Sequence, residues 1–197
     1  YDAVTLQDIL DGLGCSKGSF YHHFESKLDV LAAVCQARTR EAIERFDAGR
    51  TGEPLSDLGF LLREACILRR GDEALAGSLA AMAERSEGPV LLHALRLATE
   101  DAFYPEFVRL ATELSKADLA SFSGEAALRV AFDGYLGGCA LAVREISRAE
   151  TGAAQNARRL LQAACRQAET TLGLPYGCLN PPDFDETRLA AAAAPPP

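Results

Sequence analysis

The sequence contains no run of eighteen apolar residues, about the length that a membrane-spanning helix requires. Apolar residues nevertheless make up 48% of the 197 positions, so the composition predicts a soluble globular protein. A chain of this length can form one substantial core, or a small domain docked on a larger one. No secretory signal pattern opens it, and we expect a cytoplasmic protein with no membrane partner. Because Tyr1 falls inside a predicted folded unit, we expect a further N-terminal segment to precede it.

No CxxC pair occurs among the six cysteines, which are scattered along the chain. Zinc ribbons need closely paired ligands and disulfide scaffolds are denser in cysteine, so the pattern argues against both. We expect reduced thiols that act mostly as small core residues. The adjacent His22 and His23 would point about 100° apart on a helix, which disfavours a shared metal ion. The sequence therefore predicts neither a metal site nor a cofactor.

The common catalytic motifs are also missing. We find no HExxH, no GxSxG, no GxxxxGK followed by Ser or Thr, and no GxGxxG after a strand. Gly12, Gly14 and Gly18 come near the last pattern, but the third glycine is one residue late and no strand precedes them. We therefore predict no catalytic residue and no enzymatic activity.

Cations are scarce, with 20 Lys and Arg against 28 Asp and Glu, for a net charge of −8. Phosphate binding needs local positive charge, so this balance weighs against nucleic-acid partners. A basic patch only a few residues wide can still lie on an acidic body. The net charge alone therefore does not exclude DNA binding.

The N-terminal fifty residues predict a short helix, a tight turn, a second short helix and a long helix. Apolar residues recur at helical spacing in the first helix, at Leu6, Ile9, Leu10 and Leu13. Gly14 suits the helix stop, because glycine tolerates the left-handed conformation. Ser16 can cap the next helix, and Ser26 with Asp29 forms the capping signal of the long helix. This order of elements is typical of a helix-turn-helix.

The stretch SKGSFYHHFESK, residues 16–27, supplies the groups that DNA contact requires. In a helix-turn-helix, the N-terminal residues of the second helix meet base edges in the major groove. Here those residues are Ser16, Lys17, Gly18 and Ser19. Gly18 would let the backbone approach DNA closely, since no side chain stands in the way. Tyr21 and His22 suit phosphate oxygens, and Lys27 adds an ammonium at the start of the following helix.

The segment TLQDILDGLGCSKGSFYHHFESKLDVLAAV closely resembles the DNA-binding domain of TetR-family transcriptional repressors. The matching residues are Thr5, Ile9, Gly14, the stretch Ser16–Phe24, Ser26 and Lys27. The resemblance covers residues 1–46, and the rest of the chain matches the family only in being helical and of suitable length. Departures from the family pattern at Leu10, Gly12, Leu13 and Cys15 concern local packing rather than the motif.

The resemblance implies a helix-turn-helix, a long connecting helix and a divergent helical domain for ligand binding and dimerisation. It implies phosphate contacts from Thr5, Tyr21, His22 and Lys27, and base reading by Ser16, Lys17, Gly18 and Ser19. It also implies a homodimer that presents two recognition helices ~34–36 Å apart to a near-palindromic double-stranded DNA operator. The family's first helix is nearly absent ahead of Thr5, which agrees with a missing N-terminal segment.

Beyond the break at Gly49–Pro54 the sequence keeps a helical period. We predict helices at roughly 55–70, 72–86, 89–114, 123–147 and 152–173, and no strands. Pro105 should kink or split the third of these. The predicted fold class is all-α, with a helix-turn-helix domain at 1–49, a helical effector-binding and dimerisation domain at 53–174, and a poorly ordered tail at 175–197.

A regulator needs an input, and large apolar side chains in the second domain suggest a pocket for a small, mostly apolar effector. The candidate ligand-binding residues are Met82, Phe103, Phe107, Phe132, Tyr135 and Cys139. An ordinary core is the alternative for each of them. Gly134, Gly138 and Ala142 recur every four residues, so another helix can approach this row closely. The row either serves a dimer interface or leaves room for a ligand.

We therefore expect a ligand-responsive repressor that leaves its operator when the effector shifts the population of subunit arrangements. One alternative input is a redox-active thiol, for which Cys139 is the leading candidate, although sequence shows neither a lowered pKa nor exposure. Another alternative is a helical dimer that has lost DNA binding and acts through a protein partner. The acidic charge favours that alternative, and residues 16–27 argue against it.

Overall fold

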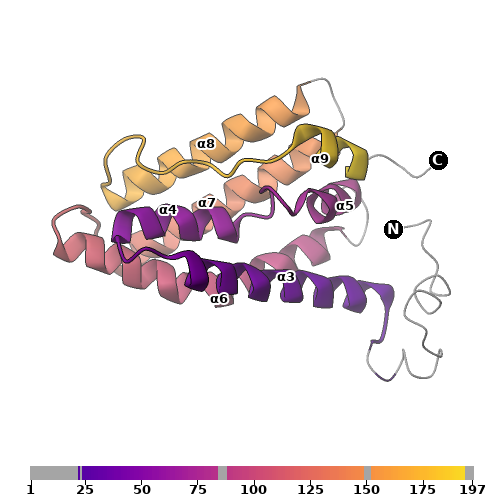
Figure 1. Cartoon of the computed structure of the whole chain (residues 1–197), viewed down its shortest axis with the longest axis horizontal. Coiled ribbons are helices and arrows are strands. Elements are labelled where there is room, and N and C mark those ends of the chain that lie inside the picture. Colours follow the sequence, from indigo (N-terminus) through magenta and orange to yellow (C-terminus); the bar gives the residue numbers. More distant parts are fainter. Residues whose placement is uncertain (1–21, 23, 84–87, 149–151, 194–197) are drawn as a thin grey trace.

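The computed structural model describes residues 22, 24–83, 88–148 and 152–193 (Figure 1). These residues form helices and loops with no strand among them, and the predicted all-α class is confirmed. The helices are α3 (Lys27–Gly49), α4 (Pro54–Ala65), α5 (Glu73–Ala83), α6 (Gly88–Lys116), α7 (Gly124–Ser147), α8 (Ala153–Leu172) and α9 (Glu186–Ala193).

The five helices predicted beyond the break are all present, and two details differ. The first ends at Ala65 rather than near residue 70, because the chain turns into a loop at residues 66–72. The third, α6, runs without interruption through Pro105, so the expected split does not occur. Phe103 and Phe107, on either side of that proline, are fully buried, and their packing holds the helix together.

The start of α3 and the turn after it are fixed by short polar contacts. Ser26 accepts the Asp29 amide at 3.2 Å and Asp29 accepts the Glu25 amide at 2.8 Å, which confirms the predicted cap. After α3, the buried Asp57 carboxylate accepts the Thr51 and Gly52 amides at 2.7 and 2.9 Å. Burial raises the pKa of Asp57, but these bonds outweigh it and hold the pKa below its usual range. The break between α3 and α4 is therefore a rigid corner.

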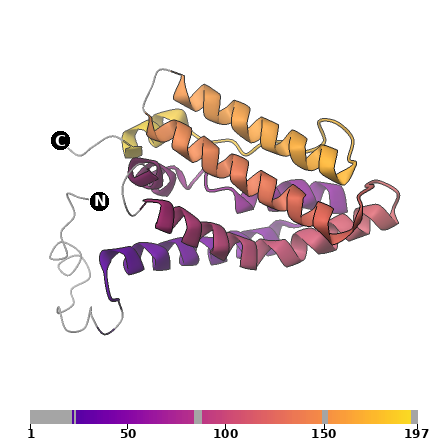
Figure 2. The same ribbon diagram turned by 180° about the vertical axis from the view of Figure 1, so that it is seen from behind.

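The helices lie in three layers, as the two opposite views show (Figures 1 and 2). Helices α3 and α6 run side by side along one face, while α7 and α8 form the opposite face. Helices α4 and α5 lie between these pairs. Phe46, Phe107, Phe132 and Tyr135 are fully buried between the layers. Among the described helices, α7 alone is long and apolar enough to cross a membrane, and its buried side chains belong to the core of this fold.

The C-terminal region is ordered through residue 193, contrary to the poorly ordered tail predicted from its prolines. We call residues 174–185 the C-terminal strap. Leu179 and Phe184 of the strap and Leu189 of α9 are buried, and α9 packs against α5. The buried Glu169 carboxylate of α8 accepts the Gly177 amide at 2.9 Å and the Leu179 amide at 2.7 Å. These buried apolar side chains and the bonds to Glu169 hold the segment in place despite its proline content.

The small-residue row on α7 packs against α8 of the same chain. A Cβ atom added at Gly138 would lie 2.5 Å from Cβ of Ala164, and one added at Gly134 would meet the Gln167 side chain. Gly137 has no neighbouring atom within 4 Å of that position. The close helix approach expected at this row therefore occurs between α7 and α8 of the same protomer.

Gly138→Ala should lower the free energy of unfolding relative to Gly137→Ala by about 1–3 kcal/mol, the usual effect of overpacking. Both changes gain the same helix propensity, so their difference isolates the contact with Ala164. Urea unfolding of the two variants measures it. Equal stabilities would show that α7 and α8 are not packed this closely.

Candidate functional site

Most of the predicted DNA-contacting residues lie outside the part of the chain that the structure describes. These are Thr5, Ser16, Lys17, Gly18, Ser19 and Tyr21. His22 is described and exposed. Lys27 is the first residue of α3, and its side chain lies outside the described atoms. The roles of all eight residues remain predictions.

A cavity of about 60 Å³ lies between α3, the end of α4, the 66–72 loop, α6 and α7. Much of its wall is apolar, from Ala42, Ala65, Ile67, Leu92, Leu95, Phe103, Leu136, Ala140 and Val143, with Cys66 and Cys139 among them. The polar part of the wall consists of Arg38, Thr39, Glu64, Arg69, Arg96 and Thr99. Four helices and a loop thus converge on one small amphipathic space.

Two of the six predicted ligand-binding residues, Phe103 and Cys139, line this cavity. The other four, Met82, Phe107, Phe132 and Tyr135, are buried in the core and do not contribute to the cavity wall. The Tyr135 hydroxyl donates to the Leu62 carbonyl at 2.7 Å, so its polar tip is satisfied within the protein. For these four residues, the ordinary-core alternative describes what the structure shows.

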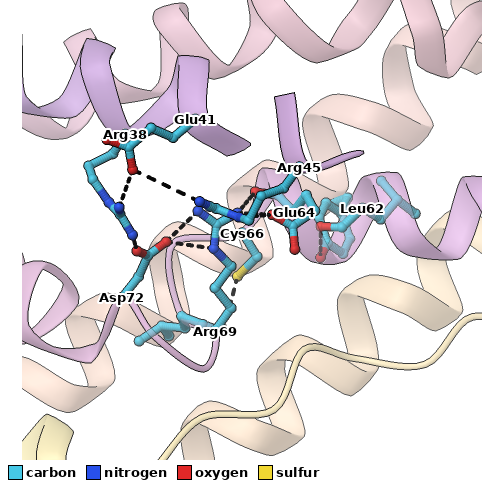
Figure 3. A network of polar contacts seen from close by, with 10 residues as sticks. Arg38, Glu41, Arg45, Leu62, Glu64, Cys66, Arg69 and Asp72 are labelled. Atoms are coloured by element: carbon cyan, nitrogen blue, oxygen red, sulfur yellow. Dashed lines mark hydrogen bonds and ion pairs between the residues drawn. The ribbon is translucent and has the colours of Figure 1, made fainter. Parts of the chain in front are cut away.

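Three residues of the polar wall, Arg38, Glu64 and Arg69, belong to an ion-pair network that sequence analysis did not identify (Figure 3). We call it the Asp72 network, and its members are Arg38, Glu41, Arg45, Glu64, Arg69 and Asp72. Asp72, only 2% exposed, lies between the guanidinium groups of Arg38 and Arg69 and pairs with both. Nε of Arg69 donates to Asp72 Oδ2 at 2.5 Å. The network therefore ties the middle of α3 to the loop between α4 and α5.

Arg69 is the most deeply buried cation in this network. It is 7% exposed, and its guanidinium also donates to Glu64 Oε2 at 2.8 Å. Burial, together with the nearby cations Arg45 and Arg38, lowers the pKa of Arg69 to about 10, although Glu64 opposes this shift. A guanidinium in this position depends on its carboxylates, because a buried charge without a partner is costly.

The thiols at the cavity are poorly suited to sensing oxidants. Burial raises the pKa of Cys139 well above its usual range, and contact with the Cys66 thiol raises it further. Elsewhere in the core, burial raises the pKa of Cys35 to about 11 and that of Cys165 to about 12. Because the thiolate is the reactive form, these environments favour inert thiols.

Residues 1–34 match the family model of bacterial regulatory proteins, tetR family. The match covers 34 of the 197 residues, so the similarity to this family is shown for the N-terminal segment. It indicates a DNA-binding transcriptional regulator, a class whose members are generally not enzymes. No curated protein and no solved structure matches the chain.

The matched segment ends at residue 34, inside α3. Arg38 lies one helical turn further on, and Arg38, Thr39 and Ala42 line the cavity. One continuous helix thus joins the family's DNA-binding segment to the cavity wall. The N-terminal end of α3 lies at the end of the body that α5 and α9 also occupy (Figures 1 and 2).

Asp72→Asn should lower the free energy of unfolding by about 3–5 kcal/mol, because it leaves two guanidinium groups without their shared carboxylate. Arg45→Gln removes a member of the same network whose side chain is 41% exposed, and should change stability by about 0–1 kcal/mol. Denaturant unfolding monitored by circular dichroism compares the two. Similar losses would mean that burial of Asp72 does not distinguish it from a surface charge.

Proposed function

We propose that the protein is a ligand-responsive repressor that binds a near-palindromic operator as a homodimer. In this proposal, a small molecule in the cavity favours a subunit arrangement whose recognition helices no longer match the operator. The proposal places the protein in the cytoplasm, where its DNA target is accessible. The observation that carries it is the double role of α3, which begins in the family-matched segment and lines the cavity with Arg38, Thr39 and Ala42.

The cavity supports a mechanical coupling because of its size. At about 60 Å³ it is far smaller than the roughly 300–1,000 Å³ of typical drug-sized pockets. An effector must therefore be compact, or it must displace the walls as it enters. The α3 wall and the 66–72 loop are the two walls joined by the Asp72 network, so displacement of the loop acts on α3 through ion pairs.

A ligand shifts such an equilibrium only by the difference between its affinities for the two arrangements. The ion pair between Arg38 and Asp72 gives the arrangements different contacts, since it exists only while α3 and the loop are aligned. An exposed apolar face of α7 supports the dimer. Val130 and Leu141 are 57% and 53% exposed along that face, where a second copy of the chain could cover them. The buried thiols do not favour a redox input over a ligand.

Selection from a pool of random duplexes, followed by salt titration, tests the proposal. A repressor of this kind enriches one near-palindromic sequence, and log K falls with log salt at a slope of about −0.9 per phosphate contact. Enrichment of an unpaired half-site would contradict the homodimer. Absence of binding even at low salt would contradict DNA binding altogether and leave a helical protein that acts through another partner.

Lys27→Ala should weaken binding about equally for all duplexes and reduce the salt slope by about one phosphate contact. Lys116 at the end of α6 provides the control, because Lys116→Ala removes the same charge far from the N-terminal end of α3. Parallel titrations of the two variants on the selected duplex measure the slopes. If both variants keep the original slope, Lys27 makes no phosphate contact.

A further inference from the structure

We propose that the cavity takes a compact organic monocarboxylate, whose carboxylate replaces Asp72 between Arg38 and Arg69 while its apolar body lies against α6 and α7. The regulatory consequence of this exchange rests on the proposed function. The binding itself does not, and it is measured without DNA.

The charge of the wall selects an anion. Three arginines and a single carboxylate, Glu64, line the cavity, whereas Asp72 reaches the guanidinium groups from the loop. The third arginine, Arg96, is held by Asp133 at only 3.4 Å and is 45% exposed, so its guanidinium retains donors for another partner. A cationic ligand would meet three like charges here, and a neutral one would offer Arg38 and Arg69 no charge in exchange for Asp72.

The geometry of the donors selects a carboxylate among anions. A guanidinium presents a planar fork of donors that suits carboxylate oxygens. Asp72 shows this arrangement, because its Oδ2 pairs with Nε and a terminal nitrogen of Arg69 while its Oδ1 pairs with Arg38. Exchange of one carboxylate for another keeps the charge of the network constant. Both guanidinium groups therefore keep a charged partner when the ligand binds.

The remaining wall selects the body of the ligand. Leu92, Leu95, Phe103, Leu136 and Val143 of the same cavity wall offer apolar contact. A volume of about 60 Å³ admits a short aliphatic chain and not an extended lipid or a polycyclic molecule.

The exchange has a structural consequence. Once a ligand carboxylate holds Arg38 and Arg69, Asp72 loses both of its guanidinium partners. The 66–72 loop then no longer needs to stay against α3. The link that the ligand breaks is thus the same link that joins α3 to the loop.

Calorimetric titration of the full chain with butyrate and with butyramide tests the inference. The two probes have nearly the same size and shape and differ in charge. Butyrate should bind at least about tenfold more tightly, since charged hydrogen bonds are the stronger ones. Ala140→Leu, which fills the apolar part of the cavity, should abolish butyrate binding. Equal affinities for the two probes, or no binding of butyrate at millimolar concentration, would overturn the proposal.

Two further variants test the position of the head group. Arg38→Gln should weaken butyrate binding about tenfold, because it removes one charged donor. Asp72→Asn should strengthen it about tenfold and raise the melting temperature of the variant on addition of butyrate but not of butyramide, because the competing carboxylate is gone. If Arg38→Gln binds butyrate as wild type does, the carboxylate lies elsewhere and the proposal fails, even where Asp72→Asn does not fold.

Butyrate that binds as expected but leaves operator affinity unchanged would preserve the carboxylate site and contradict the ligand-responsive repressor. Butyrate that does not bind, in a protein that still selects a near-palindrome, would contradict the site and preserve the DNA-binding function. The two proposals can therefore fail independently.

Discussion

The pairing of one buried carboxylate with two guanidinium groups is the constraint on which the cavity and its connection to α3 depend. Asp72 is almost fully buried, so Arg38 and Arg69 must both stay near it. This requirement sets the position of the 66–72 loop against the middle of α3. The same two arginines also form part of the polar wall of the cavity. One of these pairs thus holds α3, the helix in which the family-matched segment ends.

The loop is also held from the opposite side by the C-terminal region. Glu73 accepts the Gly71 amide at 2.8 Å and the Asp185 amide at 3.1 Å, and Arg70 pairs with Asp183 of the strap at 2.5 Å. The strap is itself anchored on α8 through Glu169. The loop is thus clamped between α3 and the strap, and release on the α3 side leaves it attached to the α7–α8 side. Such a loop moves away from α3 rather than unfolding.

Sequence periodicity predicted the helices well, because each amphipathic stripe is a local property. It identified Gly138 as a point of close approach, but not its partner, because Ala164 becomes its neighbour only when α8 folds back. The predicted pocket residues are mostly large apolar side chains. Such side chains fill a core as readily as they line a cavity. The polar wall combines arginines from positions 38, 69 and 96, which only the tertiary fold brings together. The proline content of the tail predicted poor order, but Leu179 and Phe184 are buried and anchor it. Their contacts are with residues distant in the sequence, so the local composition does not reveal them.

Amide hydrogen exchange in the wild-type chain and in Asp72→Asn tests most directly whether Asp72 holds α3 in place. The account predicts that exchange between Arg38 and Phe46 of α3 and across the 66–72 loop accelerates beyond the increase in the α7–α8 pair, where only the overall loss of stability acts. An increase of the same size in all three regions would contradict it. Asp72 would then stabilise the fold as a whole without linking α3 to the cavity.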